Sequence, residues 1–95
     1  MNCNELIYSR HAITQMFERH ISKPEVETVI ETGEEITGYP NDQPFPSSLI
    51  LGFAGERPIH IVVAYHENEK KCIIITVYEP DPKIWDEGFK KRKKL

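Results

Sequence analysis

The chain has little of what would mark a secreted or membrane protein. It holds two cysteines, Cys3 and Cys72, in 95 residues, which are too few and too far apart to indicate a disulfide framework. No apolar run approaches the roughly 18 residues that a membrane helix needs. The first ten residues lack the basic and apolar regions of a signal peptide. We therefore expect a cytoplasmic protein with no membrane partner.

Neither cysteine is expected to do chemistry. Cys72 lies in the apolar stretch "CIIITVY", where a buried, inert thiol is the expected state. Cys3 lies near a chain end that is expected to fray. A reactive cysteine needs a partly exposed, electropositive setting, which neither stretch offers.

Positive charge is scarce outside the C-terminus. The chain carries 12 Lys and Arg against 15 Asp and Glu, a formal net charge of −3. Five of the positive charges stand in the tail "KKRKKL", so residues 1–89 hold seven basic residues and a net charge of −8. That body is not the basic surface typical of nucleic-acid-binding proteins. The tail is either a site for phosphate or an acidic partner, or a disordered, solubilising end.

Length and composition indicate one globular domain over residues 1–89, followed by the basic tail at 90–95. A chain of 95 residues supports one modest core. Its content of 39% hydrophobic and 28% charged residues favours a folded domain over disorder.

Two helices are expected in the first third of the chain. Over residues 10–20, Ser9 suits the N-cap. The stretch "SKPE" is a capping box with Ser22 as cap and Glu25 three residues on, and Gly33 is expected to end the second helix in a left-handed conformation. The apolar stripes are Ala12, Ile13, Met16 and His20 on the first helix, and Val26, Val29 and Ile30 on the second.

Four strands are expected to follow, at 34–40, 48–54, 58–66 and 71–79. They are separated by a proline-rich loop "NDQPFPS", a turn "GER" and a loop "ENEK". The residues 79–89 are a proline-broken connection that leads to a turn or short helix. The order ααββββ predicts an α+β fold, with two helices packed on a four-stranded, mainly antiparallel sheet.

The last two strands are apolar on both faces, which predicts burial on both sides of the sheet. Two helices cover only one face. The other face must be covered by the segment with Trp85 and Phe89, by a second copy of the chain, or by a partner protein.

One face of the first helix carries chemistry-bearing side chains. His11, Gln15 and Glu18 are spaced i, i+4 and i+7, and Arg19 lies beside them. A histidine acts as acid or base near neutral pH, and an arginine matches phosphate oxygens. Together they suit RNA cleavage, although a solvated helix face explains the same pattern.

His60 stands in an otherwise apolar strand, either as a hydrogen-bonded core histidine or as a site residue. Thr76 and Tyr78 share a parity on the next strand. A loop of residues 68–70 would bring Tyr78 opposite His60, whereas a two-residue loop would turn it away, because a one-residue slip reverses the face. The register stays open at this point.

The four histidines, His11, His20, His60 and His66, do not have the spacing of a helical or knuckle metal site. No glycine-rich phosphate loop, nucleotide fingerprint or serine-nucleophile elbow is present. We therefore expect no metal and no cofactor.

Three stretches together resemble a protein family. They are "YSRHAITQMFERHIS", "EVETVIETGEEITGYPNDQPFPSSLILGF" and "RPIHIVVAYHENEKKCIIITVYEPDPKIW". Across residues 8–85 the chain is similar to the domain of unknown function 4258 family. More remotely, the helix–helix–meander order resembles the RelE and BrnT toxin superfamily.

That remote resemblance implies a toxin that cleaves mRNA and is silenced by an antitoxin. It implies His11, His60 and Tyr78 as catalytic residues and Arg19 as the phosphate ligand, with no metal. Gln15, on the helix face of His11, and Thr76, at the strand parity of Tyr78, are the further residues expected to bind substrate. The expected function is a metal-independent RNA endonuclease with RNA and an antitoxin or homodimer partner. The alternative is a non-catalytic interaction module that oligomerises or binds a partner through its exposed sheet face.

Overall fold

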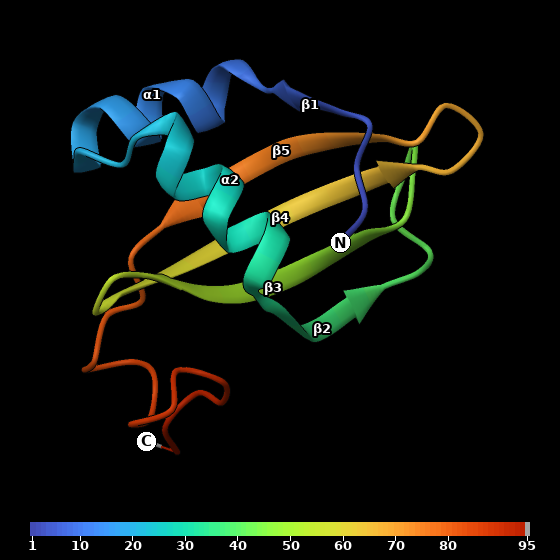
Figure 1. The fold of residues 1–95 in the computed structure, drawn as a ribbon. Coiled ribbons are helices and arrows are strands. Elements are labelled where there is room, and N and C mark those ends of the chain that lie inside the picture. Colours follow the sequence, from blue (N-terminus) through green and yellow to red (C-terminus); the bar gives the residue numbers. More distant parts are fainter. Residues whose placement is uncertain (95) are drawn as a thin grey trace.

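The structure is a computed structural model that describes residues 1–94, and Leu95 of the predicted tail lies outside the described residues. Helices and strands follow the order βααββββ (Figure 1). The elements are β1 (Glu5–Tyr8), α1 (Arg10–Arg19), α2 (Lys23–Thr32), β2 (Glu34–Tyr39), β3 (Ser47–Ala54), β4 (Arg57–His66) and β5 (Lys71–Tyr78).

The sheet has five strands in the order β1-β5-β4-β3-β2. Strands β2 to β5 form the antiparallel meander that the sequence predicts, whereas β1 pairs in parallel with β5. The sheet is therefore mixed and has one strand more than predicted. The four-residue stretch "ELIY" is too short for its sequence to predict a strand. It forms β1 because it lies beside the free edge of β5 and pairs with it.

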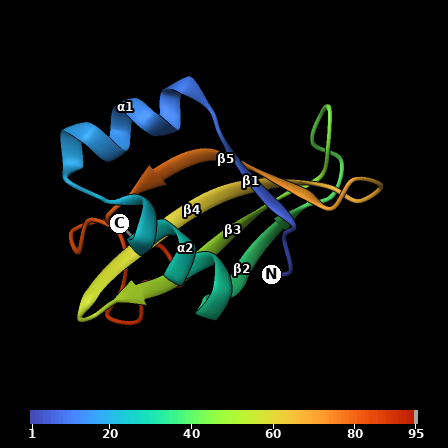
Figure 2. The same cartoon turned by 45° about the horizontal axis from the view of Figure 1, so that its top comes forward.

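Both helices cover one face of the sheet (Figures 1 and 2). The predicted stripe of α2 is confirmed, since Val26, Val29 and Ile30 are buried. The stripe of α1 is wrong in part, because Ile13 is 51% exposed and His20 is exposed. The buried residues of α1 are Ala12, Gln15 and Met16.

The predicted N-caps are confirmed. The Ser9 side chain accepts a hydrogen bond from the Ala12 N–H, and Ser22 and Glu25 form the reciprocal capping box. The prediction of a left-handed cap at Gly33 is wrong, because its backbone is extended with φ −76°. Glycine is required there by close approach instead, since a Cβ would lie 2.5 Å from the Val29 carbonyl oxygen.

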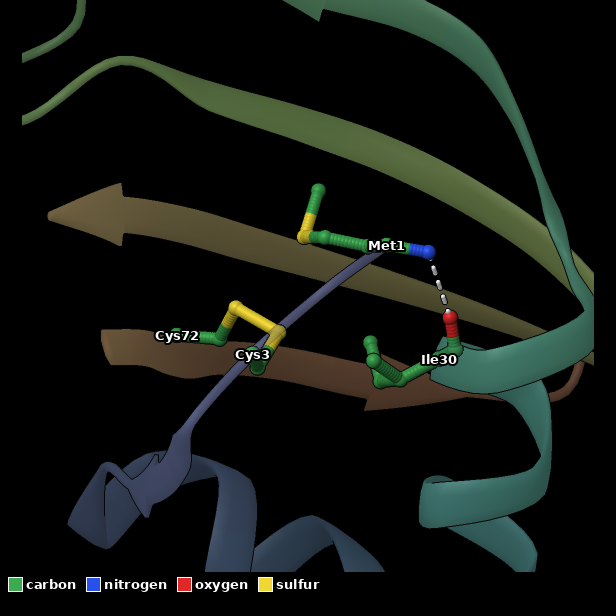
Figure 3. The surroundings of a disulfide bond; sticks show 4 residues. All are labelled: Met1, Cys3, Ile30 and Cys72. Atoms are coloured by element: carbon green, nitrogen blue, oxygen red, sulfur yellow. Dashed lines mark hydrogen bonds between the residues drawn. A yellow bond between two sulfur atoms is a disulfide. The ribbon is translucent and has the colours of Figure 1, made fainter. Parts of the chain in front are cut away.

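The two cysteines form a disulfide, which corrects the prediction of two unpaired thiols. Cys3 and Cys72 are 69 residues apart in sequence and 5.7 Å apart between Cα atoms. The pairing of β1 with β5 sets Leu6 opposite Cys72 and brings the N-terminal segment alongside β5. Figure 3 shows the bond and, near it, the terminal amino group of Met1 donating to the Ile30 carbonyl over 3.0 Å. The N-terminus is thus held at two points.

The face of the sheet away from the helices is partly covered by residues 79–94, the C-terminal segment (Figure 1). Of the three coverings that the sequence allows, the segment with Trp85 and Phe89 is the one observed: Trp85 is buried and its ring packs on the ring of His60. The segment forms an isolated bridge between Trp85 and Arg92, and a turn in which the Trp85 N–H donates to the Asp81 carbonyl over 2.9 Å. No helix lies within residues 79–94, so the predicted turn or short helix is a turn.

Candidate functional site

His60 is completely buried between the sheet and the C-terminal segment. Its Nδ1 atom lies 3.0 Å from the Tyr78 hydroxyl, and its Nε2 atom lies 2.8 Å from the carbonyl oxygen of Phe89. The Trp85 ring closes over it edge-on, with ring centroids 4.5 Å apart. A polar side chain at the centre of an apolar strand is therefore fully paired.

The register that sets His60 opposite Tyr78 depends on a bulge. Near the turn, His66 pairs with Lys71, and that alignment would place Tyr78 on the wrong face. Between Val62 and Val63 the register shifts by one residue, with Ile75 as the extra residue. The observed turn spans 67–70 and is not the three-residue loop 68–70. Because of the bulge, Tyr78 nevertheless lies opposite His60, as the three-residue loop would have placed it.

The hydrogen bonds of His60 define its tautomer. A carbonyl only accepts, so Nε2 carries the proton and donates it to Phe89. The Nδ1 lone pair is then free to accept from the Tyr78 hydroxyl. Burial lowers the pKa of His60, with the Phe89 carbonyl opposing, so the ring is neutral at neutral pH. Burial likewise raises the pKa of Tyr78, which keeps its phenol protonated.

Tyr78 forms part of the wall of a cavity of about 420 Å³ between the sheet and the C-terminal segment. We call this cavity the Tyr78 pocket. Its lining combines aromatic rings with two cations and holds no acidic side chain among the described residues. Lys90 also pairs with Glu34 over 2.9 Å, and the guanidinium of Arg92 lies 5.6 Å from the Trp85 ring centroid. The lining residues are Thr37, Tyr39, Leu49, Val62, Tyr78, Trp85, Lys90 and Arg92.

Gln15 lies outside this pocket and has a different task. Its side-chain carbonyl oxygen accepts a hydrogen bond from the Val77 N–H over 2.8 Å, in a buried position. Beside it, the Ser9 N–H donates to Ile74 and the Ser9 hydroxyl donates to Ile75, the bulge residue. Beyond the end of β1, the Ser9 cap and the Gln15 side chain of α1 thus hydrogen-bond the free edge of β5. The burial of Gln15 is explained by this structural role at the edge of the sheet.

The remaining predicted residues divide between the two faces of the sheet. His11 and Arg19 are exposed on α1, whereas His60 is covered by the C-terminal segment on the opposite face (Figure 1). Thr76 is half-buried, pairs with Val62 and shares the face of Tyr78. The structure therefore brings together His60 and Tyr78, and places Thr76 on the same face, two residues further along the two strands and outside the lining of the Tyr78 pocket. It does not bring His11 or Arg19 to them.

Arg57 is a cation that the sequence pattern did not single out. It donates to the carbonyl oxygens of Arg19 over 2.6 Å and His20 over 2.8 Å, at the end of α1. It also lies 3.7 Å from carboxylate oxygens of Glu25 and Glu79. These contacts join the turn between the helices to the start of β4.

No group of three or more His, Cys, Asp and Glu side chains within residues 1–94 is arranged to hold a metal ion. Over the same residues, no helix is both long and apolar enough to cross a membrane.

Of the residues that line the Tyr78 pocket, the sequence identified Tyr78 as a site residue, and Lys90 and Arg92 as part of a tail for which phosphate binding was one interpretation. Tyr39 and Trp85 were not identified as site residues. The aromatic residues and cations of 85–92 were visible as a cluster. Their position over His60 was not, because no periodicity links an irregular segment to a strand.

The structure thus defines an α+β domain with a mixed sheet. Its aromatic, basic pocket lies on the sheet face opposite the helices. The chain belongs to the domain of unknown function 4258 family, whose model matches residues 8–79. No curated protein and no solved structure matches it. The family match ends one residue after Tyr78, so the segment that covers His60 lies outside it.

Proposed function

We propose that this protein binds single-stranded RNA in the Tyr78 pocket and cleaves it without a metal ion. The observation that carries the proposal is the Tyr78 hydroxyl, which is hydrogen-bonded to a neutral His60 and forms the wall of a pocket with two cations. Aromatic rings stack on unpaired bases, and Arg and Lys attract phosphate. The pocket concentrates these groups in a protein whose body is otherwise acidic.

The chemistry follows from the direction of the Tyr78–His60 hydrogen bond. The ribose 2′-hydroxyl transfers its proton to the Tyr78 oxygen while the Tyr78 proton moves to Nδ1 of His60. The 2′-oxygen attacks phosphorus, the bond to the 5′-oxygen breaks, and that oxygen takes a proton from water. The products are a 2′,3′-cyclic phosphate and a 5′-hydroxyl, and the proton on His60 returns to solvent through Tyr78.

The two pocket cations support the charge that develops on the phosphate. Arg92 and Lys90 line the pocket beside Tyr78, where positive groups stabilise the pentacovalent state. The Phe89 carbonyl accepts from Nε2 and stabilises His60 while it carries the extra proton. In the wider setting, we propose a toxin of the RelE or BrnT kind with an antitoxin partner, as the sequence resemblance implies.

A cleavage assay with a fluorophore-labelled single-stranded RNA in EDTA tests this function. Tyr78→Phe keeps the ring but removes the hydroxyl, and cleavage should fall at least about 100-fold while RNA binding is retained. Tyr65→Phe, on the helix-covered face, is the matched control and should cleave like the unaltered protein. RNA that stays intact with the unaltered protein, or equal cleavage by Tyr78→Phe, would refute the proposal.

A second candidate function, a non-catalytic interaction module, is favoured by the outer side of α1. Ile13 is 51% and Phe17 83% exposed, and they are one helical turn apart. This candidate predicts a stable oligomer, measured by light scattering after gel filtration, that Phe17→Ser dissociates. Monomers at all tested concentrations together with RNA cleavage would exclude self-association and favour the first function.

A further inference from the structure

A second cavity, of about 610 Å³, adjoins the Tyr78 pocket. We call it the loop pocket, because it lies where β2 ends and the loop to β3 begins. The two cavities share Tyr39 and Val62 as lining residues. Tyr39 is 42% exposed and lines both cavities, so it forms part of the wall between them. The loop pocket is lined by Gly38, Tyr39, Pro40, Asn41, Asp42, Ser47 and Val62.

The two cavities differ in charge. The Tyr78 pocket holds Lys90 and Arg92, whereas among residues 1–94 the one charged side chain in the lining of the loop pocket is the carboxylate of Asp42. A phosphate is attracted to the first cavity and repelled from the second. A neutral base with N–H donors is suited to the second, because an ionised carboxylate only accepts hydrogen bonds.

Two hydrogen bonds hold the Asp42 carboxylate in place. Its Oδ1 atom accepts from the Gln43 N–H over 3.2 Å, and its Oδ2 atom accepts from the Ser47 hydroxyl over 2.7 Å. Ser47 is buried, so the carboxylate is anchored from the floor of the pocket. Each carboxylate oxygen keeps lone pairs for a ligand, and the carboxylate needs no reordering when one binds.

We infer that the loop pocket is a base-reading subsite that prefers guanine, next to the phosphate subsite at Lys90 and Arg92. The inference rests on the RNA-binding function proposed above and names the substrate that this function takes. Guanine is the base whose pairing edge offers two adjacent N–H donors, which match the two oxygens of Asp42. The Tyr39 ring supplies a stacking face for that base, and Asn41 adds a donor and an acceptor at the rim.

The single tryptophan, Trp85, provides the readout, because it lines the Tyr78 pocket and reports a ligand there through its fluorescence. Single-stranded RNA trinucleotides with a 2′-deoxy block on cleavage are titrated, with G, A, C or U at each position in turn. We expect guanine at one position to tighten binding about tenfold or more over the other bases. Binding of all four bases within about threefold would overturn the subsite.

Asp42→Asn is the decisive variant, with Glu56→Gln in the exposed β3–β4 turn as the matched loss of one negative charge. Asp42→Asn should abolish the guanine preference and leave the affinity for the other bases within about threefold, whereas Glu56→Gln should keep the preference. Tyr39→Leu should weaken binding of every sequence. An unchanged preference in Asp42→Asn would overturn the role of Asp42.

The outcomes separate the two proposals. If no trinucleotide quenches Trp85, RNA binding itself fails and the subsite fails with it. If trinucleotides quench Trp85 without base preference, RNA binding stands and the base-reading subsite fails. Lys90→Ser should weaken all trinucleotides alike, because phosphate contacts carry no sequence information. Lys23→Ser is the matched control, because it removes one cation from α2, on the sheet face away from both pockets.

Discussion

Tyr78 lies opposite His60 only because Ile75 is left out of the pairing between β4 and β5. The turn at 67–70 by itself sets a register in which the two side chains would point to opposite faces. The bulge reverses that outcome, and the hydroxyl of Ser9 donates to the carbonyl of the bulge residue over 3.0 Å. A helix cap at one end of the chain thus supports the geometry of the candidate site.

Acid should destabilise the fold through His60. Its pKa in the folded protein is below the ordinary 6.5, because burial disfavours the imidazolium. Between those two pKa values the unfolded chain binds more protons than the folded one, so stability is complete above pH 6.5 and falls as pH drops below it. The slope approaches about 1.4 kcal/mol per pH unit. Urea unfolding from pH 8 to pH 5 measures it.

His60→Gln is the comparison for that titration. The amide can hydrogen-bond both partners but does not titrate, so the variant should be less stable at pH 8 and lack the decline below pH 6.5. A variant that shows the same decline as the unaltered protein would assign the effect to other groups.

Gln15 should contribute to stability and not to RNA binding. Gln15→Met keeps the size of the side chain but leaves the buried Val77 N–H without its acceptor. The expected loss is about 1–3 kcal/mol in the free energy of unfolding. Amide hydrogen exchange should show lost protection at Val77 in particular. Weaker RNA binding at full stability would instead place Gln15 in a substrate site.

The disulfide should stabilise the N-terminal strand and the fold as a whole. Closing a loop of this length constrains the unfolded chain by about 4 kcal/mol in the chain-entropy model. Dithiothreitol should therefore lower the midpoint of urea unfolding of the oxidised protein. Cys3→Ala should have the low midpoint with or without reductant. Equal midpoints of oxidised and reduced protein would show that β1 holds its place without the bond.

Arg57 should be needed to join the helical turn to the sheet. Arg57→Ala removes two charge-assisted donors from the carbonyls of Arg19 and His20, and we expect a loss of about 1–2 kcal/mol in unfolding free energy. Arg57→Lys should lose part of this, because an ammonium lacks the planar fork that reaches two carbonyls. Denaturant titration of both variants at low and at raised salt separates the hydrogen bonds from the long ion pairs to Glu25 and Glu79, since salt screens a pair of charges more strongly than a hydrogen bond to a neutral carbonyl.

The sequence by itself determined the local structure. The three- and four-residue spacing of Val26, Val29 and Ile30 and the caps at Ser9 and Ser22 identify two helices, because these signals act within a few residues. Alternation and β-branched runs identify β2 to β5. The apolar residues at both parities of β4 and β5 correctly required a cover for the second face.

Only the tertiary structure decided which distant residues meet. The pairing of β1 with β5, the bond between Cys3 and Cys72, and the contact of Gln15 with Val77 each join residues more than 60 positions apart. The bulge at Ile75 depends on what lies at the free edge of β5, and the cover over His60 depends on an irregular segment. Helical and strand periodicity show which face of its own helix or strand a side chain lies on. They hold no information on which distant segment of the chain packs against that face.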